Sequence, residues 1–218
     1  MRWFPLLAAV LLLGACNQMT STQPLFSAAD AAGAPALKDG LWLTDEPDCR
    51  VDVRKPVQKW PVCARWYVVR GGEVLNFHAA DRDSPAEWET MSFLLASGEP
   101  RIMQADIRGV LNQADKPVPM FMYLALTPTV LDSEGRITAQ NWWMVLCGPP
   151  PLDARGKPDP AAQTKAPFAG MTLIKAEGEK GFDADCTASD RGSVRAAAVA
   201  SQALGPVKAD RWIRDTLP

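Results

Sequence analysis

Residues 120–147, MFMYLALTPTVLDSEGRITAQNWWMVLC, decide the fold class of this chain. Two apolar runs, 120–131 and 136–147, flank Asp132-Ser133-Glu134-Gly135, whose residue types favour a turn. The pattern predicts two antiparallel strands joined as a hairpin. Because alternate residues of a strand share a face, the first strand is apolar on both faces. One face carries Met120, Met122, Leu124 and Leu126, and the other carries Phe121, Tyr123 and Ala125. Such a strand is either covered on both faces or lines a cavity.

Other short apolar runs continue the β pattern on both sides of this hairpin. They predict strands at residues 41–43, 64–70, 73–79, 101–110 and 171–176. A short helix is expected to begin at Ser84-Pro85-Ala86-Glu87. Residues 90–97 then fit either a continuation of this helix or a strand, and we favour the strand.

A second helix is expected near the C-terminus. Residues 193–204 are rich in alanine, and Gly205-Pro206 would end the helix. Trp212 and Ile213 are expected to pack onto the body of the protein. The predicted fold is therefore mainly β (α+β), an antiparallel barrel or strongly bent sheet of about seven to nine strands with a C-terminal helix packed on it.

The first residues carry the most specific motif of the chain. Arg2 precedes an apolar run, residues 3–13, that is too short to span a bilayer of ~30 Å, so the run indicates a secretory signal. The segment Leu13-Gly14-Ala15-Cys16 resembles the lipobox of bacterial lipoproteins. The resemblance implies that a signal peptide, residues 1–15, is removed and that Cys16 carries a diacylglyceryl thioether and an acylated amine. Asn17 follows in place of the aspartate that retains enteric lipoproteins in the inner membrane, which implies an outer-membrane anchor facing the periplasm.

The remaining chain divides into a tether and one domain. Residues 16–36 contain few large apolar side chains and are expected to form a lipidated N-terminus and flexible tether. Residues 37–218 are expected to form a single globular periplasmic domain. Six prolines between residues 148 and 168 predict an extended surface loop within it.

Four cysteines follow the lipobox, and an even number in an exported protein favours disulfides. We expect neighbours in the sequence to pair, Cys49 with Cys63 and Cys147 with Cys186. Zinc is not expected, because no pair has the short spacing of a structural zinc site. The 23 basic and 25 acidic side chains are nearly balanced, which argues against nucleic acid as a partner.

The sequence offers only weak candidates for catalysis or metal binding. His78, the one histidine, is followed by Asp81 and Asp83, but no serine lies in a G-x-S-x-G elbow. The acidic residues Asp81, Asp83, Glu87 and Glu89 lack the spacing of an EF-hand calcium loop. Met120 and Met122 suit copper(I), but they belong to an apolar stripe typical of a core. No metal, cofactor or named reaction is therefore predicted.

Trp142 and Trp143 form the most informative pair. Neighbouring side chains of a strand point to opposite faces, so one indole faces the core and the other faces away. With Phe121 and Tyr123 they form a candidate platform for an apolar or extended ligand. Besides the lipobox, Trp142-Trp143, Cys147-Gly148, Pro149-Pro150-Pro151 and Cys186 resemble uncharacterised proteobacterial lipoproteins, a resemblance that implies no activity.

The expected function is a membrane-anchored, non-enzymatic binding or assembly module of the bacterial envelope, whose partners are the lipid bilayer and an apolar or extended ligand or an envelope protein. The alternatives are an envelope hydrolase using His78 and nearby carboxylates, and a tethered protein inhibitor.

Overall fold

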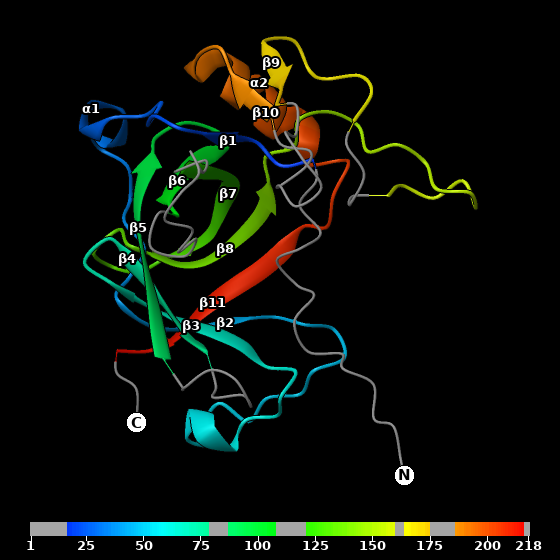
Figure 1. Ribbon diagram of the computed structural model, residues 1–218. Coiled ribbons are helices and arrows are strands. Elements are labelled where there is room, and N and C mark those ends of the chain that lie inside the picture. Colours follow the sequence, from blue (N-terminus) through cyan, green and yellow to red (C-terminus); the bar gives the residue numbers. More distant parts are fainter. Residues whose placement is uncertain (1–16, 79–86, 108–120, 160–163, 175–185, 216–218) are drawn as a thin grey trace.

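A closed antiparallel barrel forms the centre of the protein. The computed structural model describes residues 17–78, 87–107, 121–159, 164–174 and 186–215, with the backbone alone for residues 77, 78, 87 and 88. Within these residues, the barrel strands are β2 (Gly40–Thr44), β3 (Arg65–Arg70), β4 (Glu73–His78), β5 (Glu87–Ala96), β6 (Arg101–Asp106), β7 (Phe121–Leu131), β8 (Ile137–Met144) and β11 (Lys208–Arg214). Their order is β7-β6-β5-β4-β3-β2-β11-β8, and β8 returns to pair with β7 (Figure 1).

Smaller elements cover the barrel. A short strand, β1 (Thr20–Ser21), pairs with β7. The strands β9 (Met171–Leu173) and β10 (Cys186–Ala188) form a separate pair beside the helix α2 (Arg191–Ser201). The single turn α1 (Ala28–Ala31) follows β1, and a 3₁₀ turn, η1 (Val57–Lys59), lies between β2 and β3. This arrangement confirms the predicted mainly β fold with a C-terminal helix.

The structure confirms most of the predicted strands and the C-terminal helix, and it adds short elements and one barrel strand that were not predicted. The short helix expected from Ser84-Pro85-Ala86-Glu87 is wrong at Glu87, where the strand β5 already begins. Residues 90–97 belong to the strand β5 almost throughout, so the strand interpretation holds. The helix α2 begins two residues before the expected start, because Asp190 caps it by accepting a hydrogen bond from the Ser193 backbone N–H at 2.9 Å. Trp212 and Ile213 do more than pack on the body, since they lie in β11, a barrel strand that the sequence interpretation missed.

Apolar side chains gather in three clusters. The barrel interior holds Leu37, Trp42, Val69, Leu95, Met103, Leu126 and Ile137. One outer face packs under α2 and the N-terminal segment, with Tyr123, Trp143, Val194 and Ala198 among its members. Another outer face packs under the segment between β2 and β3, with Leu41, Leu43, Val57, Trp60 and Val68. The central strands are thus covered on both faces, which explains why strands such as β7 carry apolar side chains on both faces.

Gly40 begins β2 at a place where no side chain fits. Its φ is +129°, and a Cβ atom there would meet the Arg214 carbonyl oxygen and the Trp212 indole nitrogen. The glycine therefore lets β2 approach β11 at the point where the barrel closes.

The expected flexible tether over residues 16–36 is wrong for the described residues 17–36. Met19 and Phe26 are almost completely buried, and β1 extends the sheet along β7. The backbone N–H groups of Leu25 and Phe26 donate to Gln104 Oε1 at 2.8 and 2.9 Å, and Gln104 Nε2 donates to the Phe26 carbonyl at 3.1 Å. The low apolar content of the segment led to the prediction of a tether. Two buried apolar side chains and the hydrogen bonds of one buried glutamine nevertheless fix the segment to the barrel.

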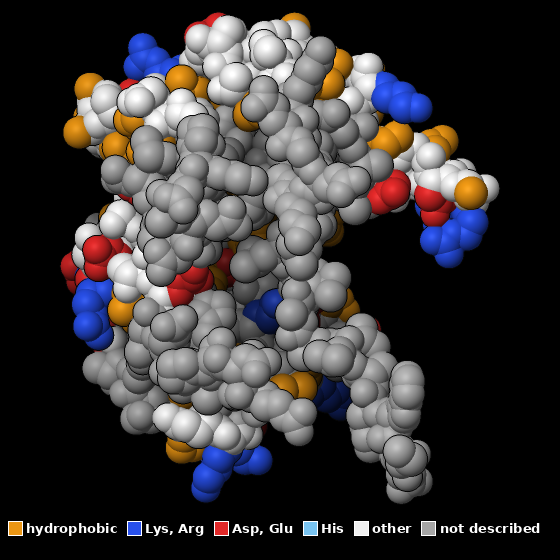
Figure 2. Space-filling view, viewed as in Figure 1, with side chains coloured by type: hydrophobic (Ala, Val, Ile, Leu, Met, Phe, Trp, Pro, Cys, Tyr) orange, Lys and Arg blue, Asp and Glu red, His pale blue; other side chains and the backbone are white. Residues whose placement is uncertain are grey.

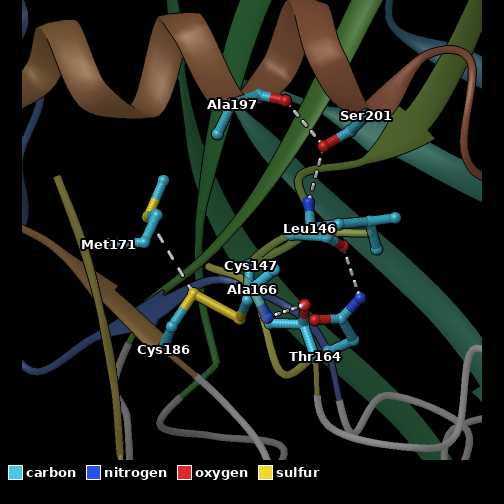
Figure 3. The surroundings of a disulfide bond; sticks show 10 residues. Leu146, Cys147, Thr164, Ala166, Met171, Cys186, Ala197 and Ser201 are labelled. Atoms are coloured by element: carbon cyan, nitrogen blue, oxygen red, sulfur yellow. Dashed lines mark hydrogen bonds between the residues drawn. A yellow bond between two sulfur atoms is a disulfide. The ribbon is translucent and has the colours of Figure 1, made fainter. Parts of the chain in front are cut away.

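Both predicted disulfides are confirmed. Cys49 bonds to Cys63, and Cys147 bonds to Cys186 across 39 residues of sequence. The second disulfide lies beneath α2, where the Ser201 hydroxyl donates to the Ala197 carbonyl and accepts from the Leu146 N–H (Figure 3). This polar bridge ties the helix to the end of β8 directly above the buried sulfur atoms.

Phe26→Ala is expected to cost about 3–5 kcal/mol in the free energy of unfolding, because it empties a buried site in the largest outer cluster. Gln23→Ala, three residues away and exposed, is the matched control and is expected to change the stability by less than about 0.5 kcal/mol. Urea unfolding of both variants measures the difference. Equal, small effects would show that the segment behaves as a tether.

Candidate functional site

A pocket of about 490 Å³ opens where four barrel strands end beside the Cys49–Cys63 disulfide. Its described lining residues are Thr44, Glu46, Pro47, Asp48, Cys49, Cys63, Arg65, Trp142 and Lys208. Four of them lie in strands, near the end of β2, the start of β3, the end of β8 and the start of β11, and the other five belong to the segment between β2 and β3. The pocket therefore forms where this segment meets the ends of strands that barrel closure brings together.

Glu46 organises the charges at the rim of this pocket. Lys208 Nζ lies 2.9 Å from Glu46 Oε2, and Arg65 Nε lies 3.4 Å from Glu46 Oε1. One carboxylate thus pairs with two cations, and Asp48 adds a second carboxylate to the pocket lining, so the charges at the rim are balanced. The Arg65 side chain is about half exposed, so this rim is open to solvent and to a charged ligand.

A buried carboxyl group lies below the rim. Asp210 is only 3% exposed and faces Thr44 of β2 and Gln140 of β8 in the strand register. The Tyr67 hydroxyl donates to Asp210 Oδ2 at 2.6 Å, and the Tyr67 ring stacks on Trp42 inside the barrel. A polar layer therefore separates the pocket from the apolar interior.

Burial governs the protonation of this layer. Burial raises the pKa of Asp210 above its usual value of 3.8, although contacts from Tyr67, Trp142, Thr44 and Gln140 oppose the rise. The pKa of Tyr67 is also raised, by burial and then by the neighbouring Asp210 charge. Both shifts favour the neutral forms, so the layer disfavours additional negative charge.

Polar atoms of this layer remain unsatisfied. Asp210 Oδ1, Gln140 Oε1 and Trp142 Nε1 are buried and have no hydrogen bond in the described structure. The Trp142 N–H lies near enough to Asp210 to stabilise its charged form, but the contact does not reach hydrogen-bond geometry. An unsatisfied buried polar atom costs about 1–3 kcal/mol, so each of these atoms calls for an explanation, such as a functional role or a bound water.

The two tryptophans separate as strand alternation predicts. Trp143 is 1% exposed in the cluster beneath α2, and its Nε1 donates to the Ala198 carbonyl at 2.8 Å. Trp142 points to the other face, where it is partly buried and forms part of the pocket wall. Trp143 is therefore a structural side chain, and Trp142 is the indole available to a ligand.

The rest of the candidate platform is structural. Tyr123 is fully buried beside Ser21, whose hydroxyl lies 2.7 Å from the phenol oxygen. Phe121 packs against the same cluster, on the face of β7 opposite the pocket. The structure thus groups Phe121, Tyr123 and Trp143 under the outer layer and leaves Trp142 apart from them.

The candidate catalytic residues are not assembled into a site by the described structure. The backbone of His78 ends β4 opposite Glu87 of β5. Asp81 and Asp83 lie outside the described residues, as do Cys16 and Met120. Among the residues that the structure describes, no group of three histidine, cysteine, aspartate or glutamate side chains is placed to hold a metal ion.

The sequence interpretation missed Glu46, Arg65, Lys208 and Asp210. Lys208 and Asp210 lie in β11, whose sequence KADRWIR mixes charged and apolar side chains on both faces and so gives no strand pattern. Glu46 and Arg65 gave no local signal, because only the fold brings them to Lys208.

No protein-family model, curated protein or solved structure matches the chain. In the described part of the chain, none of the helices is long and apolar enough to cross a membrane.

The free energy of unfolding of Asp210→Asn, measured relative to that of the wild type, is expected to increase as the pH rises from about 4 to about 8. The raised pKa means that the folded wild type binds the Asp210 proton more tightly than the unfolded chain does. The contribution of Asp210 is therefore complete below the unfolded value near 3.8 and is lost as the pH rises through the folded-state pKa. Urea unfolding of both proteins across this range measures the effect.

Asp190→Asn is the control of opposite sign. Hydrogen bonds from the Ser193 backbone and the Ser189 side chain lower the pKa of Asp190, so its contribution is lost only as the pH falls below the usual range. The stability difference for this variant should stay constant between about pH 5 and about pH 8. A constant difference for Asp210→Asn as well would show that burial does not keep its carboxyl group neutral.

Proposed function

We propose that this protein is a lipoprotein of the bacterial cell envelope that binds a small or extended ligand at the mouth of its barrel. The lipobox-like segment Leu13-Gly14-Ala15-Cys16 supports the anchor, with the outer membrane and a periplasmic orientation favoured by Asn17. Two disulfides fit an oxidising compartment. The binding role is not enzymatic and needs no cofactor.

The observation that carries the binding role is the position of Trp142. Its neighbour Trp143 is buried in the core, whereas Trp142 lines a pocket of about 490 Å³ together with Arg65 and Lys208. An aromatic face beside cationic and anionic side chains suits a ligand with a flat apolar part and a polar or charged group that stays at the rim. Unsatisfied polar atoms beneath the indole add to the support.

The two alternative functions receive less support. A hydrolase would use His78 with nearby carboxylates, and its support is weak because the sequence holds no G-x-S-x-G nucleophile elbow. A tethered inhibitor would need a long flexible N-terminal segment, but residues 17–26 contribute a strand and buried side chains to the domain.

Cys16→Ser is expected to release the exported protein from the membrane fraction, because the acyl chains supply the energy of anchoring at about 0.8 kcal/mol per buried methylene. Fractionation of cells and intact-mass spectrometry of the purified chain measure location and acylation. An unchanged mass and unchanged membrane association would contradict the anchor.

Trp142→Ala is expected to weaken binding of the probe 1-anilinonaphthalene-8-sulfonate about tenfold, as loss of one aromatic contact predicts. Trp142→Phe should retain most of the affinity, and Arg211→Ala, which removes an exposed charge from the same strand as Lys208, should not change it. Trp143→Ala should instead cost about 3–5 kcal/mol of stability. Fluorescence titration and urea unfolding separate the two effects, and an unchanged affinity in Trp142→Ala would contradict the proposed site.

A further inference from the structure

The chain enters the described fold at Asn17 without a spacer. Asn17 is 1% exposed, its Nδ2 donates to the Gly148 carbonyl at 2.7 Å, and its own carbonyl accepts from the Cys147 N–H at 2.8 Å. Consecutive Cα atoms are about 3.8 Å apart, so Cys16 is one peptide unit from this contact. A lipid on Cys16 would therefore hold the surface around Gly148 close to the bilayer.

A hairpin leaves the fold at the same place. Three prolines follow Gly148, and Leu152 then pairs with Pro158 across a turn. The turn is closed by hydrogen bonds from Asp153 N to the Lys157 carbonyl and from Gly156 N to the Asp153 carbonyl, at 2.7 and 2.9 Å. In Figure 1 this yellow-green segment projects from the body of the protein, away from the barrel.

The hairpin presents both apolar and basic groups. Leu152 is 66% exposed, and Arg155 and Lys157 are exposed beside it. Asp153 lies 3.0 Å from Arg155 and accepts the backbone N–H groups of Arg155 and Lys157, so Asp153 and Arg155 form an exposed ion pair within the turn. Asp159 ends the segment at its base. Figure 2 shows hydrophobic, basic and acidic side chains together at this projection.

We propose that the hairpin of residues 151–158 is a second membrane contact, with Leu152 entering the headgroup layer and Arg155 and Lys157 lying among the lipid phosphates. This inference rests on the proposed lipid anchor at Cys16. An apolar side chain flanked by long cationic ones is the composition of an interfacial element, because the apolar group enters the bilayer while the cations remain at its polar surface. Asn17, which follows the anchored cysteine, is bonded to Gly148, which precedes the hairpin, so a single membrane surface can contact both.

Site-specific fluorescence tests this contact in the full acylated chain. Leu152→Cys, labelled with a nitrobenzoxadiazole dye, is reconstituted into vesicles of phosphatidylethanolamine and phosphatidylglycerol with or without spin-labelled lipid. Ser133→Cys is the matched control, since Ser133 is exposed in the turn before β8 whereas the hairpin follows the end of β8. The eight-residue strand β8 is roughly 26 Å long, and the two positions lie beyond its opposite ends along the chain.

The dye at position 152 should emit at a shorter wavelength when the protein is bound to vesicles. Spin-labelled lipid should quench this dye at least about twofold more than it quenches the dye at position 133. Equal quenching at the two positions in a vesicle-bound, acylated protein would overturn the hairpin contact and leave the anchor intact. A chain that carries no acyl group and stays free of the vesicles would overturn the anchor and the contact together. Vesicle flotation and intact-mass spectrometry distinguish these two results.

Discussion

The closing strand β11 is the element on which the rest of the structure depends. It pairs antiparallel with β2 through Asp210–Arg214 and with β8 through Lys208–Arg211. Without it both neighbours would be sheet edges with unpaired backbone groups. The same strand supplies Lys208 to the pocket rim and Asp210 to the polar layer below. Closure of the barrel and assembly of the pocket are therefore one event.

The separation of Trp142 from Trp143 shows how a strand covered on both faces places one indole in a core and the next in a pocket wall. The indole on the outer face is held by α2, where packing and one hydrogen bond satisfy it. The indole on the inner face meets a polar layer whose buried groups are incompletely satisfied. A core selected for stability alone would replace Asp210 and Gln140 by apolar side chains, since partly satisfied buried polar groups destabilise a fold. Their presence beneath the pocket is consistent with a role in recognition.

The sequence was sufficient for features that depend on local pattern. The hairpin at residues 120–147, most of the other strands, the helix near residues 193–204 and the pairing of neighbouring cysteines all follow from periodicity, turn residues and spacing. Features that depend on partners distant in sequence could not be predicted in the same way. Lys208–Arg214 shows no regular alternation of charged and apolar residues, and only pairing with β2 and β8 makes it a barrel strand. Residues 17–26 have a composition typical of a linker, yet Met19 and Phe26 enter a core built from later parts of the chain.

The burial of Asn17 affects the order in which the N-terminal segment is processed and docks onto the barrel. An enzyme that cuts the peptide bond before Cys16 has to reach the chain on both sides of that bond. Once Asn17 is bonded to Cys147 and Gly148, and Thr20–Ser21 is paired with β7, the side that follows the cysteine is no longer accessible. If Cys16 is modified as proposed, processing must come before the N-terminal strand docks. The docking partners lie more than 100 residues later in the chain, so slow synthesis and export of these residues would keep the processing site accessible.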